Sequence, residues 1–112
     1  MKFIVAIIQP HRIDAVREAL NDAGIAGLTV SEVRGYGRQR GHKEVYRGAE
    51  YTINYVPKLK LEIAVDDNKA EEISEVIMRS ARSGKIGDGK IFVFDLQSAT
   101  RIRTGEIGSQ AL

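Results

Sequence analysis

The chain has 112 residues, no cysteine and a formal net charge of +2 at pH 7. This length predicts one domain with its own core, small enough to gain stability by associating with other copies. The composition, 43% hydrophobic and 29% charged, excludes a disordered or fibrous chain, and the lack of cysteine excludes disulfides and thiolate metal sites.

The opening residues, MKFIVAIIQP, imitate the start of a signal peptide, because Lys2 precedes an apolar run. The run is too short for that role, and Pro10 and His11 follow it without a small-residue cleavage site. Residues 3–8 are instead predicted to form a strand that is buried on both faces. We therefore expect a cytoplasmic protein.

A helix and a second strand are predicted next. From Arg12 to Ala23, apolar residues recur at spacings of three and four, and Gly24 supplies a stop signal. Residues 28–36 are predicted to form a strand in which the alternation of apolar and polar residues is interrupted around Glu32 and Val33.

The segment from Gly35 to Tyr55 has neither a helical nor a strand period, and it contains all four tyrosines: Tyr36, Tyr46, Tyr51 and Tyr55. Four basic residues against two acidic ones give it a charge of +2, which equals the net charge of the chain. Its only large aliphatic residues are Val45 and Ile53, so it can bury little apolar surface. We expect a long loop that becomes ordered on a partner or over a bound effector.

The second half of the chain predicts a strand, a helix and a further strand. After Pro57, apolar and other residues alternate cleanly, with one face made by Leu59, Leu61, Ile63 and Val65. A helix is expected to start near Asn68, which with Glu71 forms a variant of the capping box. Its apolar stripe is Ala70, Ile73, Ile77 and Ala81, and a glycine-rich loop separates it from a strand at residues 90–96.

The predicted order of elements is βαββαβ. Right-handed crossovers fold this order into an antiparallel four-stranded sheet with both helices on one face, which is the ferredoxin-like α+β arrangement. The other face of the sheet would lie bare, and since the first and last strands are apolar, other copies of the chain are its expected cover.

The most distinctive local pattern is SGKIGDGK at residues 83–90. The spacing from Gly84 to Lys90 is that of a Walker A motif, but Ile91 stands where Ser or Thr is required, and the loop leaves a helix instead of entering one. These departures argue against a P-loop NTPase. Three glycines still allow consecutive N–H groups to converge on an anion beside Lys90, although a plain turn is the alternative.

A pair of arginines occurs in RIRTG at residues 101–105. In an extended segment, Arg101 and Arg103 would point to the same side about 6 to 7 Å apart, with Ile102 facing inward. Such a pair can clamp a phosphate, and the alternative is a solvated edge strand. With the glycine loop and Lys90 on a neighbouring strand, the pair favours polyphosphate binding.

Other motifs are incomplete. RGYG at residues 34–37 matches the first four positions of an RNA-recognition signature, but Arg38, Gln39 and Arg40 replace its aromatic core. A basic RNA-binding module on a ferredoxin-like fold stays as the alternative function. Neither histidine has a partner at metal-ligand spacing, and no catalytic constellation can be argued, so we do not expect an enzyme.

Three segments combine into a more specific pattern: YRGAEY at 46–51, SGKIGDGKIFVFDL at 83–96 and RIRTGE at 101–106. Together they resemble the PII nitrogen-regulatory signal-transduction proteins, and the resemblance runs from end to end. It implies a non-enzymatic regulator of nitrogen assimilation, built as a homotrimer of single-domain subunits over residues 1–112. It also implies three functional loops: the T-loop (37–55), the B-loop (82–90) and the C-terminal loop (101–109).

The resemblance implies that ATP or ADP binds in clefts between subunits. The residues expected to bind the nucleotide are Thr29, Gly37, Arg38, Glu62, Ala64, Gly87, Asp88, Gly89, Lys90, Arg101 and Arg103. Arg101 and Arg103 would reach the B-loop of a neighbouring subunit. The residues expected to bind 2-oxoglutarate are Gln39, Arg40, Gly41, Lys58 and Gly87, with Mg²⁺ held by Gln39 and the ATP phosphates. ATP and 2-oxoglutarate would bind cooperatively, so the coupling must be reciprocal.

The T-loop would be the effector arm that enters or caps target proteins. The partners implied are an ammonium channel, a nucleotidyltransferase and enzymes of nitrogen metabolism, without nucleic acid and without direct membrane insertion. Tyr51 matches a tyrosine that is a nucleotidylation site in many members of the family. Ala49 replaces the serine that is phosphorylated in cyanobacterial members.

The sequence also departs from the family pattern. Gln9 stands where Lys or Arg is expected near the 2-oxoglutarate carboxylate, which bears on the affinity for that ligand. Arg40 replaces the usual Lys, and His11 replaces the usual Phe. Ala64 replaces Val, which trims an apolar contact to adenine but leaves any backbone contact available.

Overall fold

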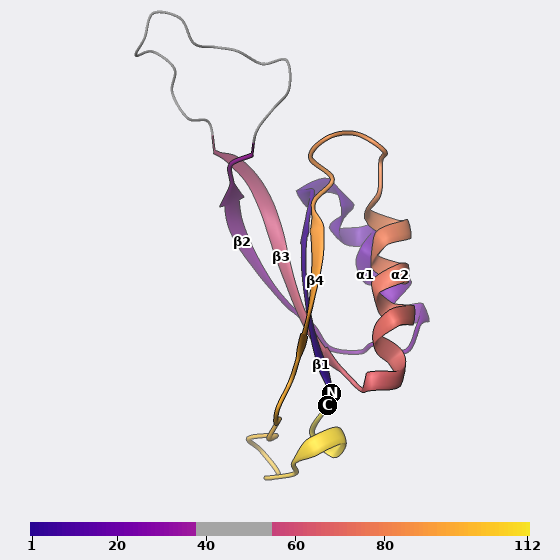
Figure 1. Ribbon diagram of the computed structural model, residues 1–112, viewed down its shortest axis with the longest axis vertical. Helices are drawn as coiled ribbons and strands as arrows, with labels where there is room; N and C mark the ends of the chain where they lie inside the picture. Colours follow the sequence, from indigo (N-terminus) through magenta and orange to yellow (C-terminus); the bar gives the residue numbers. More distant parts are fainter. Residues whose placement is uncertain (38–54) are drawn as a thin grey trace, which may run out of the picture.

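The computed structural model describes residues 1–37 and 55–112 of the chain (Figure 1). Its helices and strands are β1 (Lys2–Ile8), α1 (Ile13–Asp22), β2 (Thr29–Gly35), β3 (Val56–Val65), α2 (Ala70–Ala81) and β4 (Lys90–Asp95). Within the described residues there are also short 3-10 turns at η1 (Pro10–Arg12), η3 (Asp67–Lys69) and η4 (Gly108–Ala111). No helix in the two described ranges is long and apolar enough to cross a membrane.

The strands form one antiparallel sheet in the order β2-β3-β1-β4, and both helices lie on the same side of it (Figure 1). The predicted βαββαβ order and the ferredoxin-like α+β fold are therefore confirmed. Pro57 lies inside β3 rather than before it, opposite Arg34 of the edge strand β2. The pairing of β2 with β3 runs without interruption from Thr29 to Gly35, so the slip in its hydrophobic pattern is not a slip in register.

The core lies between the sheet and the helices. Alternate residues of β1 and β3 are buried, and so is the predicted stripe of α2. The buried cluster consists of Ile4, Ala6, Ile8, Val16, Leu20, Leu61, Ile63, Val65, Ala70, Ile73, Ile77 and Ala81. Each large aliphatic side chain in it contributes about 1.5–3 kcal/mol through removal from water, so this one-sided core anchors both helices.

The opposite face of the sheet carries apolar side chains that are only partly covered. Phe92 and Phe94 of β4 are 46% and 53% exposed, and they pair with Val5 and Phe3 of β1. Burial alternates along β1, so the expectation that this strand is buried on both faces is wrong for a single chain. The exposed face is the surface that other copies are expected to cover.

The ends of the helices confirm one prediction and correct another. α1 ends at Asp22, and Ala23 and Gly24 follow it, with Gly24 at a φ of +92°, as the stop signal predicts. The expected capping box at Asn68 is wrong, because η3 takes Asn68 into a 3-10 turn and α2 begins at Ala70 without a side-chain cap. The flanking acidic side chains make tertiary contacts instead: Asp66 accepts the Ser109 hydroxyl at 2.6 Å.

The burial of the α2 stripe generates a stability prediction. Ile77→Ala is expected to lower the free energy of unfolding by about 2–5 kcal/mol, because Ile77 is fully buried and the substitution leaves a cavity. Met78→Ala is the matched control on the exposed side of the same turn and should cost about 1 kcal/mol or less. Urea denaturation at one fixed protein concentration measures both, and equal losses would contradict the assigned core.

Candidate functional site

The B-loop connects the end of α2 to the start of β4 and is tied together by Asp88. Oδ2 of Asp88 accepts hydrogen bonds from the N–H groups of Ser83 and Gly84, each at 2.8 Å, and Oδ1 accepts the Ser83 hydroxyl. The Ser83 hydroxyl is the main reason that the pKa of Asp88 falls from 3.8 to about 2. The carboxylate therefore stays ionised at neutral pH and closes the loop on itself.

Glycine is required at two positions of this loop. Gly89 has a φ of +108°, and a Cβ built on it would lie 1.7 Å from the carbonyl oxygen of Ile7. Gly87 has a φ of +101°, and a Cβ there would lie 3.3 Å from Nε2 of Gln9 and 3.6 Å from Nζ of Lys58. These side chains would therefore be crowded by any larger residue at position 87.

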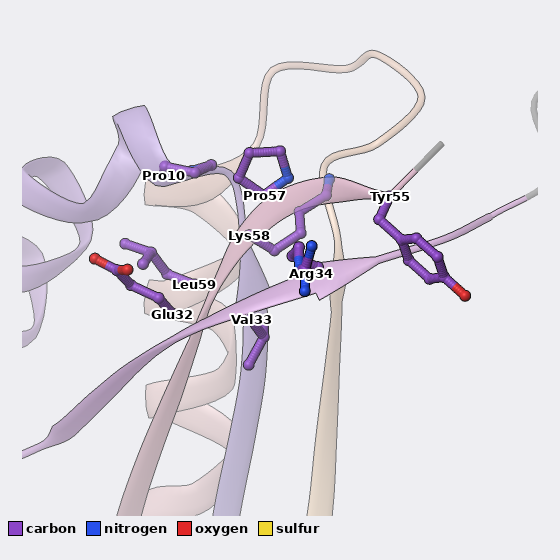
Figure 2. Close-up of a pocket in the computed structure, with 8 residues that line it drawn as sticks. All are labelled: Pro10, Glu32, Val33, Arg34, Tyr55, Pro57, Lys58 and Leu59. Atoms are coloured by element: carbon purple, nitrogen blue, oxygen red, sulfur yellow. The ribbon is translucent and has the colours of Figure 1, made fainter. Parts of the chain in front are cut away.

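Lys58 links β3 to the B-loop, because its ammonium donates a hydrogen bond to the carbonyl oxygen of Gly87. It also lines an open cavity of about 980 Å³ at the same end of the sheet. Figure 2 shows the residues in the described part of the chain that line this cavity. They come from the turn after β1, from the end of β2 and from the start of β3: Pro10, Glu32, Val33, Arg34, Tyr55, Pro57, Lys58 and Leu59. Tyr36 and Tyr55 lie beside each other at this end, with ring centroids 6.0 Å apart.

A second group of expected site residues lies toward the other end of the sheet. Thr29 of β2 is the direct cross-strand partner of Glu62 on β3. Ala64 lies two residues further along β3 and pairs with Phe3 of β1. Because strand residues two apart share a face, Thr29, Glu62 and Ala64 all lie on the face that the helices leave uncovered.

The C-terminal loop differs from the extended segment that its sequence suggested. Thr100 bridges to Ile107, and the intervening residues form a tight turn in which the Gly105 N–H bonds to the Arg101 carbonyl at 2.8 Å. Ile102 is 99% exposed, so the prediction that it faces inward is wrong. Neither is this segment a strand beside Lys90: it follows the opposite end of β4 from the B-loop (Figure 1).

Arg101 is engaged within its own chain. Its guanidinium lies 3.5 Å from the Glu106 carboxylate and donates to the Leu112 carbonyl oxygen at 3.1 Å. Arg103, two residues along the same turn, is exposed. The two arginines are thus presented at one end of the subunit, away from the glycine loop.

The structure consequently sorts the expected residues into two groups. In the first group, Lys58 contacts Gly87, which is followed by Asp88, Gly89 and Lys90. The second group lies on the sheet and consists of Thr29, Glu62 and Ala64. Arg101 and Arg103 follow the far end of β4. Gly37 follows β2 at the same end as Lys58. The sequence predictions for Arg38, Gln39, Arg40, Gly41, Tyr46, Ala49 and Tyr51 fall on residues 38–54, which lie outside the described ranges.

Sequence reasoning missed two contributors to the B-loop. Ser83 supplies two of the three hydrogen bonds to Asp88, and a serine at the start of a glycine loop with an acid five residues later was the available signal. Arg12 donates to the Arg82 carbonyl at 3.3 Å, and its charge also lowers the pKa of Asp88. Nothing in the sequence pattern of η1 marks Arg12 for this contact. Among the described residues, no group of three or more His, Cys, Asp and Glu side chains could hold a metal ion.

Comparison with known proteins gives a consistent result along the whole chain. The family model "Nitrogen regulatory protein P-II" matches residues 1–106. The nitrogen regulatory protein P-II of Pasteurella multocida is 56% identical and that of Rhizobium etli 57% identical, each over the full 112 residues of both chains. The nitrogen regulatory protein GlnK of Escherichia coli is 53% identical over the same length.

The hydrogen bonds of Asp88 generate a prediction about its titration. We expect the carboxyl carbon of Asp88, followed by NMR, to titrate near pH 2, and Ser83→Ala to raise this pKa toward 3.8 because the largest cause of the shift is lost. Ser80→Ala is the control, since the Ser80 hydroxyl bonds to Val76 within α2. Because the pKa is lowered, the loop's stabilisation is fully present above the ordinary carboxyl pKa and is lost as the pH falls through about 2. A midpoint at the ordinary value would contradict the geometry.

Proposed function

Because the chain belongs to the nitrogen regulatory protein P-II family, and is therefore a non-enzymatic signal-transduction regulator, we propose that it senses ATP or ADP together with 2-oxoglutarate as a homotrimer. The trimer consists of single-domain subunits spanning residues 1–112 that act in the cytoplasm. Membership of this family replaces the alternative of an RNA-binding module.

The separation of the expected nucleotide residues into two groups is the observation that carries the proposal. Lys90 begins β4 and Arg101 follows its other end, and six strand residues span about 20 Å. A hydrogen bond to a phosphate requires a donor–acceptor distance of about 3 Å, so Lys90 and Arg101, at opposite ends of β4 in one chain, cannot hold the same phosphate. A second copy must bring its Arg101 and Arg103 to the B-loop of the first, which makes each nucleotide site a shared one.

The uncovered face of the sheet supports the same assembly. It carries the half-exposed Phe92 and Phe94 together with Thr29, Glu62 and Ala64. Association through this face would bury the phenylalanines and bring the adenine-binding residues of one copy toward the phosphate-binding loop of the next. Nucleotide binding and trimer contacts then depend on the same surface.

Within the B-loop, the glycine conformations support phosphate binding. Gly87 and Gly89 have positive φ values, which let the backbone approach an anion without a Cβ in the way. Lys90 follows directly as a cation, and the Arg101 guanidinium can exchange its contact with Glu106 for a bidentate phosphate contact.

For 2-oxoglutarate we propose the end of the sheet where Lys58 meets Gly87. Lys58 would receive the distal carboxylate, and Gln9 lies close enough to Gly87 to contribute an amide donor without adding a charge. Gln39, Arg40 and Gly41 would complete this site. The side-chain oxygen of Gln39 and the ATP phosphates are hard oxygen ligands of the kind that Mg²⁺ prefers, and the ion would neutralise the charge between the two anionic ligands.

The partners would be bound through the T-loop, residues 37–55. We propose an ammonium channel, a nucleotidyltransferase and enzymes of nitrogen metabolism as its target classes, with Tyr51 as the residue that a nucleotidyltransferase would modify. The relatives that carry the name GlnK support a place in the same regulatory system.

The shared phosphate site leads to a first binding prediction. Arg101→Ala or Lys90→Ala should each weaken ATP and ADP binding by about 1.5 to 3 kcal/mol, the range for a charge-assisted hydrogen bond, while the fold stays intact. Isothermal titration calorimetry measures the affinities. Lys69→Ala is a control, because Lys69 lies in η3, where its ammonium is 3.7 Å from the Glu72 carboxylate. Unchanged affinity in both site variants would contradict the shared site.

A second prediction concerns the dicarboxylate. 2-Oxoglutarate should bind measurably only with Mg-ATP, and Lys58→Ala or Gln39→Ala should remove this binding while leaving much of the ATP affinity, because each loses a direct contact to the dicarboxylate or its metal. Calorimetric titrations with and without nucleotide measure it. Binding of 2-oxoglutarate without nucleotide, or no binding under either condition, would show that the site is assigned wrongly.

A further inference from the structure

Asp88 is the one acidic residue in the segment 83–90, where the proposed function places anionic phosphates. Its lowered pKa, about 2, means that it carries a full negative charge at neutral pH. A carboxylate aimed at a phosphate would oppose binding by charge repulsion. The direction of this carboxylate therefore decides whether the residue hinders or helps.

The Asp88 carboxylate is turned into the loop, and both of its oxygens are occupied. Oδ2 accepts the Ser83 and Gly84 N–H groups at 2.8 Å, and Oδ1 accepts the Ser83 hydroxyl. The same hydroxyl oxygen accepts the Lys85 N–H at 3.2 Å. Three hydrogen bonds thus connect the first residues of the loop with Asp88, and a fourth links Ser83 with Lys85.

A loop of this composition needs such a tether. Gly84, Gly87 and Gly89 all adopt positive φ values, and glycine loses more conformational entropy on ordering than any other residue. Fixing each residue of the backbone costs conformational entropy. The loop's glycines allow the shape that a phosphate requires, but they do not hold it.

We propose that Asp88 and Ser83 are positioning residues: their side chains hold the B-loop backbone in its phosphate-binding shape without touching the ligand. The inference rests on the proposed function for the identity of the ligand. Its structural part, a loop closed by Asp88, does not depend on any ligand. Arg12 of η1 donates to the Arg82 carbonyl, and its positive charge offsets part of the charge of the Asp88 carboxylate.

Two other roles for Asp88 make different predictions. If its charge acted only through repulsion, removing the charge would tighten ATP binding. If it were a ligand of the Mg²⁺ that accompanies ATP, its removal would weaken ATP only when Mg²⁺ is present, and Ser83 would not matter. A positioning role predicts weaker binding with or without Mg²⁺ and the same direction of change for Ser83.

The test uses the full chain with four variants. Asp88→Asn places an amide N–H₂ where the carboxylate accepted N–H groups, so ATP and ADP should bind on the order of tenfold more weakly, with and without Mg²⁺. Ser83→Ala, which leaves the charge in place, should weaken binding about threefold, and Ser83→Thr should restore it because the hydroxyl returns. Asp22→Asn, at the far end of α1, removes the same charge elsewhere and should change nothing.

A second measurement is hydrogen exchange of the Gly84 amide, followed by NMR without nucleotide. A loss of global stability would quicken exchange throughout the chain, whereas loss of the Asp88 contacts should quicken it in the loop alone. It should quicken in Asp88→Asn and Ser83→Ala, recover in Ser83→Thr, and stay slow at Ile4 and Leu61 of the core in all four. Tighter or unchanged ATP binding in Asp88→Asn, or unchanged exchange at Gly84, overturns the proposal. If Asp88→Asn does not fold, the Ser83 pair decides. If the unmodified chain binds no ATP, the proposed function fails, while the exchange measurement still decides whether Asp88 closes the loop.

Discussion

The close approach of Gly89 to β1 sets the geometry at the end of the sheet where the B-loop meets Lys58. A Cβ at this position would overlap the Ile7 carbonyl oxygen, so only glycine lets β4 enter the sheet where Lys90 pairs with Ile7. That point of entry fixes where the preceding loop crosses the end of the sheet. The loop in turn brings Gly87 against Lys58 and Gln9. A single backbone contact therefore determines which side chains of β1 and β3 meet the B-loop.

A ferredoxin-like sheet with both helices on one side has a second face that its own helices leave uncovered. In this chain that face combines apolar residues such as Phe92 and Phe94 with polar ones such as Thr29 and Glu62. A purely structural interface would not need the polar pair, and a purely ligand-binding surface would not need exposed phenylalanines. Their mixture on one face supports the proposal that binding sites and subunit contacts share this surface.

The strands and helices were predictable because apolar residues recur every second residue in a half-buried strand and every three or four residues in a half-buried helix. β3 and the buried stripe of α2 follow these two spacings closely. The B-loop's glycines were also readable, since three of them in six residues require unusual backbone angles. The fold of the C-terminal loop was not, because its tight turn depends on a backbone bond between Arg101 and Glu106 that leaves no periodic signal. The capping prediction failed for a similar reason: Asp66 bonds to Ser109, 43 residues away in the chain, and local pattern reasoning does not see such a partner.

The contact between Lys58 and Gly87 provides a physical basis for coupling between the two ligands. The ammonium that would receive a dicarboxylate is already bonded to the loop that would hold phosphates, so a change in the position of either group alters the other. Gly87 belongs to a loop that the hydrogen bonds of Asp88 hold together. A displacement of Gly87 therefore moves the neighbouring loop residues with it. Thermodynamic linkage then requires that, if nucleotide raises the affinity for 2-oxoglutarate by some factor, 2-oxoglutarate raises the affinity for nucleotide by the same factor. In the proposed trimer, where the second half of each nucleotide site would come from another copy, this coupling would extend across the subunit contact.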